Sequence, residues 1–499
     1  MFFPILITSL GAFIGFANPI FHLPVLALLL PGGAAWIGTH AASAKKAFYF
    51  GWLAGALAYA ASLYWVALPV HNYGFLPWVL ALPCPVLLGA YLGLYPAFFA
   101  LGLYFCRELH WSLVGLGAGC LWGLLEALRG MLFTGFPWLV LASAFSIRPF
   151  VLQGVSLIGA YGLSGVLTAI AVWLGMEKKI SRQRICALGL IALIAGYGLV
   201  RVSAPVPEIG NMDVSIIQGN IDQSLKWDPA YQEETVRRYL TLSDQEAESN
   251  APDLIVWPET ALPFYFQDLS PLGSQVLALA KEREVYILAG SPAYSHDMPA
   301  DKYYLHNRAY LIGPKGIIDY YDKEHLVPFG EYIPFGEYLP FLSKLVQGVG
   351  DFMPGVKAGP ITAGRLAPGV LICYETIYPE LAQARVENGA NVLVNISNDA
   401  WFGRSSAPRQ HLHLSVLRAV EQGRYLVRAT NTGISAVIDP RGGILSTTDL
   451  FKTQTLHVKK VGLVQEKTWY HRNRKLVLST LFGGAAIFLF LGFFRRTRR

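Results

Sequence analysis

The sequence predicts an α-helical membrane bundle of eight spans with an inserted α/β domain. Of its 499 residues, 53% are hydrophobic and only 15% are charged, and the mean hydropathy is +0.39. An ordinary soluble domain carries about 25% charged residues. The first 201 residues hold ten Lys/Arg and three Asp/Glu, which leaves 30 of each for the rest, so the net charge of +7 belongs to the first part. The balanced remainder does not predict a nucleic-acid partner.

Apolar segments supply the candidate spans. No charged residue precedes Lys45, and 44 residues are enough for two spans of about 20 residues with a turn near Asn18, Pro19 or His22. A cleaved signal peptide is the alternative, disfavoured because no basic segment precedes the apolar run and the run is too long. The other six spans are expected at residues 47–68, 78–104, 111–128, 151–174, 186–200 and 476–494.

Basic residues indicate the orientation of the bundle. Lys/Arg clusters follow the second, fourth, sixth and eighth expected spans, and such clusters prefer the cytoplasmic side. These clusters contain Lys45, Lys46, Arg107, Lys178, Lys179, Arg182, Arg184, Arg495, Arg496, Arg498 and Arg499. We therefore expect both termini in the cytoplasm and the large domain in a periplasm-like space. The expected division is a bundle at 1–201, an outer domain at 202–475, and a last span with a basic tail at 476–499.

Short apolar runs and polar helical stretches alternate in the segment 202–475, which predicts layered α/β packing. Strands are expected at residues 214–218, 254–257, 285–290, 309–312, 316–321, 369–372, 392–396 and 434–438. Helices are expected at 228–249, 270–283 and 408–427, and hairpin turns at 313–316 and 440–443.

Three reactive residues each stand where an apolar strand ends: Glu259, Lys323 and Cys373. Carboxyl ends of strands are where open α/β sheets place ligand chemistry. A thiolate nucleophile, a carboxylate that accepts and returns its proton, and an ammonium that stabilises an oxyanion fit one reaction. Cys373 is the one cysteine of the outer segment, so it has no partner there for a disulfide. The alternative is an inert core cysteine, since residues 369–372 lead straight into it.

Glu, Lys and Cys in this order resemble the nitrilase superfamily of carbon–nitrogen hydrolases, and with seven spans before and one after the domain the chain is similar to the apolipoprotein N-acyltransferase family. The resemblance covers essentially the whole chain. Besides the three residues it rests on the runs at 135–139 (GFPWL), 257–260 (WPET), 323–331 (KEHLVPFGE), 373–375 (CYE) and 398–403 (NDAWFG).

The resemblance implies an α-β-β-α sandwich and a role for each matching residue. Glu259 would be the general base and acid, Lys323 the oxyanion stabiliser and Cys373 the acylated nucleophile. The matching supporting or substrate-binding residues are Glu331, Tyr374, Glu375, Trp227 and Asn307. For the two glutamates the alternative is an ordinary ion pair, and for Trp227 an interfacial anchor.

The implied activity is acyl transfer from a phospholipid, through a Cys373 thioester, to the α-amine of the S-diacylglyceryl cysteine of an apolipoprotein, in a bacterial inner membrane. Membrane lipid is a further partner, and no cofactor or metal is expected, since His411 and His413 point in different directions on one helix. Two alternatives stay open: a membrane-tethered amidase or nitrilase, and a transporter or receptor with a degenerate domain. The second is disfavoured because the acids of the bundle lie near helix ends.

The stretch 332–353 between Lys323 and Cys373 is rich in aromatic and aliphatic residues in a loop-like context. Such apolar density predicts a flap over an acyl-chain pocket or on the membrane, with docking onto the bundle as the alternative. Its apolar residues are Tyr332, Phe335, Tyr338, Leu339, Phe341, Leu342, Leu345 and Phe352.

Overall fold

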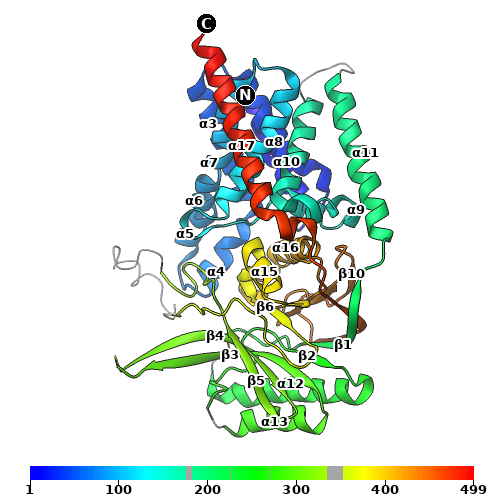
Figure 1. Cartoon of the computed structure of the whole chain (residues 1–499). Helices are drawn as coiled ribbons and strands as arrows, with labels where there is room; N and C mark the ends of the chain where they lie inside the picture. Colours follow the sequence, from blue (N-terminus) through cyan, green and yellow to red (C-terminus); the bar gives the residue numbers. More distant parts are fainter. Residues whose placement is uncertain are drawn as a thin grey trace.

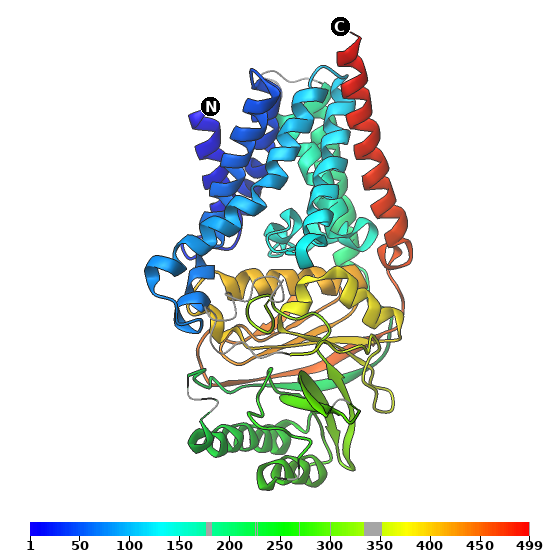
Figure 2. The same cartoon turned by 90° about the vertical axis from the view of Figure 1, so that its left-hand side faces the viewer.

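A computed structural model of the chain describes residues 1–175, 182–224, 226, 228–268, 270–299, 301–333 and 352–498. The molecule is a stack of layers (Figures 1 and 2): a helical bundle, a pair of helices, two sheets, and a second pair of helices. Both termini lie at the end of the bundle that is farthest from the sheets.

The bundle contains fewer long helices than the eight spans we expected. Within the described residues, five helices are long and apolar enough to cross a membrane, or six if the pair Ala44–Ser62 and Tyr64–Asn72, bent by 58°, is one span. Its helices are α1 (Phe2–Gly15), α2 (Leu29–His40), α3 (Ala44–Ser62), α4 (Ala67–Asn72), α5 (Trp78–Ala81), α6 (Pro83–Leu92), α7 (Leu94–Cys106), α8 (Trp111–Arg129), α9 (Pro149–Leu152), α10 (Val155–Gly175), α11 (Arg182–Ser203) and α17 (Trp469–Thr497). The five long ones are α5 to α7 taken together, α8, α10, α11 and α17.

The first 44 residues differ most from the expectation. They form α1 and α2 of 14 and 12 residues, shorter than the ~20 residues that a full span needs. The turn between them lies at Asn18, as expected, where the buried side-chain amide donates to backbone carbonyls including that of Phe21. Composition alone could not separate a full span from a shorter helix, because both are uniformly apolar.

Small residues let the bundle helices approach closely. A Cβ on Gly119 of α8 would lie 2.6 Å from the backbone oxygen of Gly165 on α10, and a Cβ on Gly165 would lie 2.7 Å from the oxygen of Gly119. Close contacts between backbones through small residues are the usual way that membrane helices pack. These two glycines therefore set the α8–α10 distance.

Two sheets form the middle of the α/β domain. The order β11-β1-β2-β3-β4-β5 makes one sheet and β10-β9-β8-β7-β6 the other. β1 to β3 run parallel in the first sheet and β6 to β8 in the second, with antiparallel strands towards the edges. The strands are β1 (Glu208–Gln218), β2 (Leu254–Val256), β3 (Tyr286–Asp297), β4 (Lys302–Gly313), β5 (Gly316–Asp322), β6 (Pro368–Ile372), β7 (Val392–Ser397), β8 (Leu426–Thr430), β9 (Ala436–Ile438), β10 (Ile444–Thr447) and β11 (Gln454–Val464).

Helices cover the outer face of each sheet, so the domain is an α-β-β-α sandwich (Figure 2). Helices α12 (Pro229–Asn250) and α13 (Pro271–Glu282) cover the first sheet, and α15 (Pro379–Glu387) and α16 (Ala407–Gln422) lie between the second sheet and the bundle. Apolar side chains such as Val256 and Ile372 fill the space between the sheets. Another core runs without a break from Leu417 of α16 to Leu152 of the bundle, so domain and bundle share one apolar interior.

All eight expected strands and both hairpins are present, but some elements were missed. The helix expected at 408–427 ends at Gln422, because Gly423 takes the left-handed conformation (φ +63°) and Leu426 and Val427 then enter β8. Strands β8, β10 and β11 and helix α15 were not expected. Leu426 fits the apolar flank of a helix as well as a strand, and only pairing with β7 distinguishes the two.

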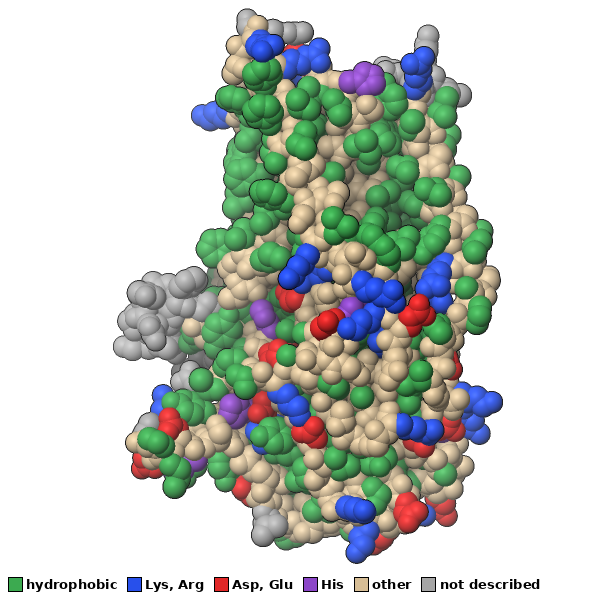
Figure 3. Space-filling view, viewed as in Figure 1, with side chains coloured by type: hydrophobic (Ala, Val, Ile, Leu, Met, Phe, Trp, Pro, Cys, Tyr) green, Lys and Arg blue, Asp and Glu red, His purple; other side chains and the backbone are tan. Residues whose placement is uncertain are grey.

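The surface agrees with burial of the bundle in a lipid phase. Hydrophobic side chains cover the bundle in Figure 3, and Lys and Arg gather at the end farthest from the sheets and where the bundle meets the domain. Phe2, Phe3 and Phe490 are among the large apolar side chains exposed on its helices. Exposed apolar area of this extent indicates contact with lipid.

Candidate active site

The three strand ends that carry Glu259, Lys323 and Cys373 meet at one place. Glu259 follows β2 by three residues, Lys323 directly follows β5, and Cys373 directly follows β6 of the other sheet. Cys373 has φ +51°, a left-handed conformation that a residue with a side chain rarely adopts. Strained backbone of this kind clusters at functional sites, where surrounding structure holds it.

Lys323 is a buried ammonium between two carboxylates. Its Nζ donates to Glu331 at 2.8 Å and lies 3.8 Å from Glu259 Oε1, while its side chain is 1% exposed. Asn307 Nδ2 bridges the same two acids, donating to Glu259 Oε1 at 2.8 Å and to Glu331 Oε1 at 3.0 Å. The backbone N–H of Asn398 donates to Glu259 Oε2 at 2.9 Å. Glu259 is therefore held at both oxygens, and Lys323 is held mainly by Glu331.

Burial and neighbouring charges determine the protonation state of the Cys373 thiol. Burial raises the pKa of the Cys373 thiol, the Glu259 carboxylate raises it further, and Lys323 opposes both. Burial lowers the pKa of Lys323, but Glu331, Glu259 and Cys373 outweigh burial and raise it above the usual value. The site thus combines a protonated thiol, a permanent ammonium and a nearby carboxylate that can accept a proton.

A buried ionic network lies behind the nucleophile. Asp399 Oδ2 accepts from Arg428 Nη2 at 2.7 Å, and Oδ1 lies 3.2 Å from His411 Nδ1. The other ring nitrogen of His411 lies 3.2 Å from the carbonyl oxygen of Cys373, which also accepts from Asn395 Nδ2 at 3.3 Å. Burial raises the pKa of Asp399, but Arg428 and His411 together hold it below its usual value. This network fixes the backbone of the strained cysteine.

Glu375 lies beside the site without touching Lys323 Nζ in any contact of the described residues. It is fully buried, and its Oε1 accepts from the Tyr321 hydroxyl at 2.7 Å and from the backbone N–H of Glu324 at 2.7 Å. Its Oε2 accepts from the N–H of Ile372 at 2.7 Å. Glu375 therefore joins the segment after Lys323 to the strand before Cys373.

A loop of the bundle reaches the site. The hydroxyls of Tyr374 and Tyr378 donate to the carbonyl oxygen of Gly135 at 3.5 and 2.9 Å. In the same loop, Trp138 Nε1 donates to Gln410 Oε1 of α16 at 2.8 Å. The ring of Trp138 also lies 5.3 Å from that of His411, between centroids. The 135–139 run and the residue after the nucleophile are thus in direct contact, although more than 230 positions separate them.

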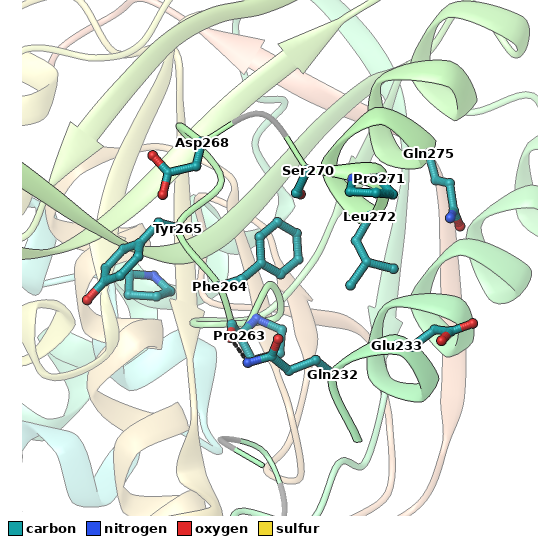
Figure 4. A pocket seen from close by; sticks show the side chains of 11 residues that line it. Gln232, Glu233, Pro263, Phe264, Tyr265, Asp268, Ser270, Pro271, Leu272 and Gln275 are labelled. Atoms are coloured by element: carbon teal, nitrogen blue, oxygen red, sulfur yellow. Dashed lines mark hydrogen bonds between the residues drawn. The ribbon is translucent and has the colours of Figure 1, made fainter. Parts of the chain in front are cut away.

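Two of the expected features lie outside the described residues: Trp227 and residues 334–351 of the expected flap. The described ends of the flap region adjoin the site, because the N–H of Phe352 donates to the carbonyl oxygen of Glu331 at 3.2 Å. A surface hollow of about 790 Å³ beside α12 and α13 (Figure 4) contains none of the expected site residues. Its lining residues are Gln232, Glu233, Pro263, Phe264, Tyr265, Asp268, Ser270, Pro271, Leu272, Gln275 and Pro292.

Sequence reasoning missed two contributors to the site. The backbone N–H of Asn398 could not be found, because a main-chain donor leaves no signal in residue type. Lys226 is 1% exposed, and its Nζ donates to Thr260 Oγ1 at 2.6 Å and to the backbone oxygen of Glu259 at 3.3 Å. Lysines on loops are common, so only its burial distinguishes it.

A buried thiol, ammonium and carboxylates at the strand ends of an α-β-β-α sandwich define the carbon–nitrogen hydrolase class, and residues 213–464 match the family model described as carbon-nitrogen hydrolase. Residues 10–173 match the apolipoprotein N-acyltransferase N-terminal domain. The chain belongs to the apolipoprotein N-acyltransferase family.

Among its relatives, an apolipoprotein N-acyltransferase of Geobacter metallireducens is 41% identical over 466 residues, 91% of this chain and 88% of the relative. One of Nitrosomonas europaea is 35% identical over 462 residues, 90% of this chain and 88% of the relative. A nitrilase-superfamily structure from Saccharomyces cerevisiae is 19% identical with a TM-score of 0.40, covering 55% of this chain and 96% of that one.

Proposed function

We propose that this protein transfers a fatty acyl group from a phospholipid to the α-amine of an S-diacylglyceryl cysteine at the N-terminus of an apolipoprotein. The observation that carries the proposal is the convergence of Glu259, Lys323 and Cys373 beside Gly135 of the bundle. The contact between the residue after the nucleophile and this bundle loop supports a membrane lipid, rather than a water-soluble molecule, as the acyl donor.

In the first half-reaction Glu259 takes the proton of the Cys373 thiol, and the thiolate attacks the ester carbonyl carbon of the phospholipid. Lys323, and in our proposal the backbone N–H of Tyr374, stabilise the oxyanion that develops. Collapse breaks the ester bond, and Glu259 returns the proton to the leaving alkoxide. The products are a Cys373 thioester and a lysophospholipid.

In the second half-reaction the α-amine of the acceptor attacks the thioester carbon. Glu259 now takes a proton from the amine, and the same oxyanion site is used again. Collapse expels the Cys373 thiolate and leaves an amide. The proton on Glu259 returns to the thiolate, so the enzyme regains its resting state.

Supporting roles follow from the contacts. Glu331 and Asn307 hold Lys323 and Glu259 at their working separation, and Glu375 fixes the segment that carries Lys323. The rest of the flap region and Trp227 complete the lipid and acceptor site in this proposal. The charges suit these roles: the Lys323 ammonium faces the developing oxyanion, and the Glu259 carboxylate faces the proton donors.

Hydrolysis of a small amide is the competing activity, since the same three residues would perform it. Family membership favours acyl transfer, as does the contact of Tyr374 with the bundle loop. A thioester must also survive until the amine arrives, and a lipid-facing site excludes water better than an open cleft.

For the membrane topology we propose eight crossings and both termini in the cytoplasm of a bacterial inner membrane. The bent α3–α4 pair counts as one crossing, and α1 and α2 each count as a short crossing, which a bilayer accommodates by local thinning. The basic clusters and the common position of the termini support this orientation. An impermeant thiol reagent added to spheroplasts should label Glu248→Cys on α12 and leave Ala42→Cys, before α3, unlabelled. Labelling at Ala42→Cys from outside would overturn the orientation.

The covalent step is tested by incubating the purified full chain with a synthetic phosphatidylethanolamine and no acceptor. The intact mass should rise by one acyl group, and neutral hydroxylamine should remove it. Cys373→Ala should show no addition, and Cys373→Ser should be severely impaired, because a serine hydroxyl is hardly ionised at neutral pH. Transfer to a lipopeptide by Cys373→Ala would refute the thioester mechanism.

A further inference from the structure

Lys226 is a second buried ammonium at the site, one for which the proposed mechanism has no use. It lies in the chain between β1 and α12, and it contacts the turn that carries Glu259. Its Nζ donates to Thr260 Oγ1 at 2.6 Å and to the carbonyl oxygen of Glu259 at 3.3 Å. Within the described part of the chain it forms no ion pair with an Asp or Glu oxygen.

An ammonium buried in this way is costly unless something nearby requires a positive charge. Burial lowers the pKa of Lys226 to about 8, and the charge of Glu259 is the one influence that opposes burial. Both hydrogen bonds go to the turn that carries Glu259, at which Thr260 has φ +48°. The hydrogen bonds and the charge interaction of Lys226 therefore all involve Glu259 and Thr260.

We propose that Lys226 is a positioning residue for Glu259. It ties the loop after β1 to the strained turn that carries the carboxylate, and it places a second positive charge beside Glu259. This inference rests on the proposed role of Glu259 as the base. Lys323 does not hold this turn, since its direct hydrogen bonds at 2.8 Å go to Glu331 and not to Glu259.

Titratable groups from three parts of the chain surround Glu259. Lys226 comes from the loop after β1, Lys323 and Glu331 from the segment after β5, and Cys373 from the end of β6. Of these, Lys226 and Lys323 attract the Glu259 carboxylate, whereas Glu331 repels it. Removal of Lys226 leaves one cation shared between two acids and leaves the turn that carries Glu259 without both of its hydrogen bonds to this ammonium.

The test measures single-turnover thioester formation with a synthetic phosphatidylethanolamine at pH 7, using the full chain in detergent. In Lys226→Gln the charge is lost but an N–H donor remains. We expect its rate of thioester formation to fall about tenfold. Lys226→Arg keeps the charge and should recover most of the rate that Lys226→Gln loses.

Two further variants separate charge from hydrogen bonding and from nonspecific effects. Thr260→Val keeps the Lys226 charge and loses the 2.6 Å hydrogen bond, so it should lower the rate less than Lys226→Gln does. Lys281→Gln removes an exposed lysine of α13 and should behave as wild type. Thermal unfolding of each variant shows that the protein is folded.

A wild-type rate in folded Lys226→Gln overturns the inference, and so does a loss of equal size in Lys226→Arg. Glu259→Gln distinguishes this failure from failure of the proposed function. If Glu259→Gln abolishes thioester formation while Lys226→Gln keeps the wild-type rate, the role of Lys226 is wrong and the base stands. If Glu259→Gln acylates at the wild-type rate, the proposed mechanism itself is wrong.

Discussion

Replacing Glu331 with Gln tests whether the position of Lys323 limits the reaction. The carboxylate holds Lys323 Nζ at 2.8 Å and accepts from Asn307 Nδ2 at 3.0 Å and from the N–H of Val327 at 2.8 Å. An amide of the same shape keeps the volume but loses the charge, and its NH₂ must face one of these donors. Lys323 is then drawn towards Glu259, which lies 3.8 Å away, and a direct ion pair would occupy the base.

The size of the effect follows from the bonds that are lost. Hydrogen bonds to charged groups contribute about 1.5–3 kcal/mol, and the Glu331 side chain is only 13% exposed, so little of this is screened. A loss of about 2 kcal/mol in the positioning of Lys323 corresponds to a rate lower by about 30-fold. We expect this loss in thioester formation, the half-reaction that needs both Lys323 and a free Glu259.

The assay is the single-turnover rise of acyl-enzyme by intact mass at pH 7, with phosphatidylethanolamine and no acceptor. Asp319→Asn is the matched control, because it breaks a lysine–carboxylate pair with Lys357 (2.6 Å) on the surface of β5. That variant should acylate at the wild-type rate. Wild-type acylation in Glu331→Gln, with the defect confined to transfer onto the amine, would refute the reasoning and assign Glu331 to the acceptor.

Three further predictions concern the buried charges. Lys323→Met should slow thioester formation by about 100-fold or more, since it removes an oxyanion donor, and a smaller loss by the same mass assay would contradict that role. Asp399→Asn leaves Arg428 and His411 without their carboxylate, and it should destabilise the fold by about 3 kcal/mol, read as a lower melting temperature in detergent. Burial lowers the pKa of His413 to about 3. The unfolded chain therefore binds this proton first, and stability that is complete above pH 6.5 falls by up to about 1.4 kcal/mol per pH unit on acidification towards pH 3. His413→Leu should flatten the decline of melting temperature between pH 7 and pH 5, and an unchanged slope would argue against this residue.

The sequence by itself determined that the protein has an apolar helical bundle, and it identified the reactive residues of the site. Uniformly apolar segments specify a lipid-facing bundle, because burying charge in lipid is costly. Short apolar runs ending at Glu259, Lys323 and Cys373 specified both the strands and the residues that follow them. These signals are local, since a strand end and the next side chain are neighbours in the chain.

Tertiary structure decided what depends on neighbours far apart in the chain. Helix α16 ends at Gln422, and Leu426 enters β8 because it pairs with the backbone of β7. The residues next to Leu426 in the sequence carry no information about this pairing. The lengths of α1 and α2 likewise depend on packing in a bundle of uniform composition. Lys226, an ordinary loop lysine in the sequence, became part of the site only when folding removed its water and set it against Glu259. Burial raises the free energy of a charged group, and burial is a property of the fold.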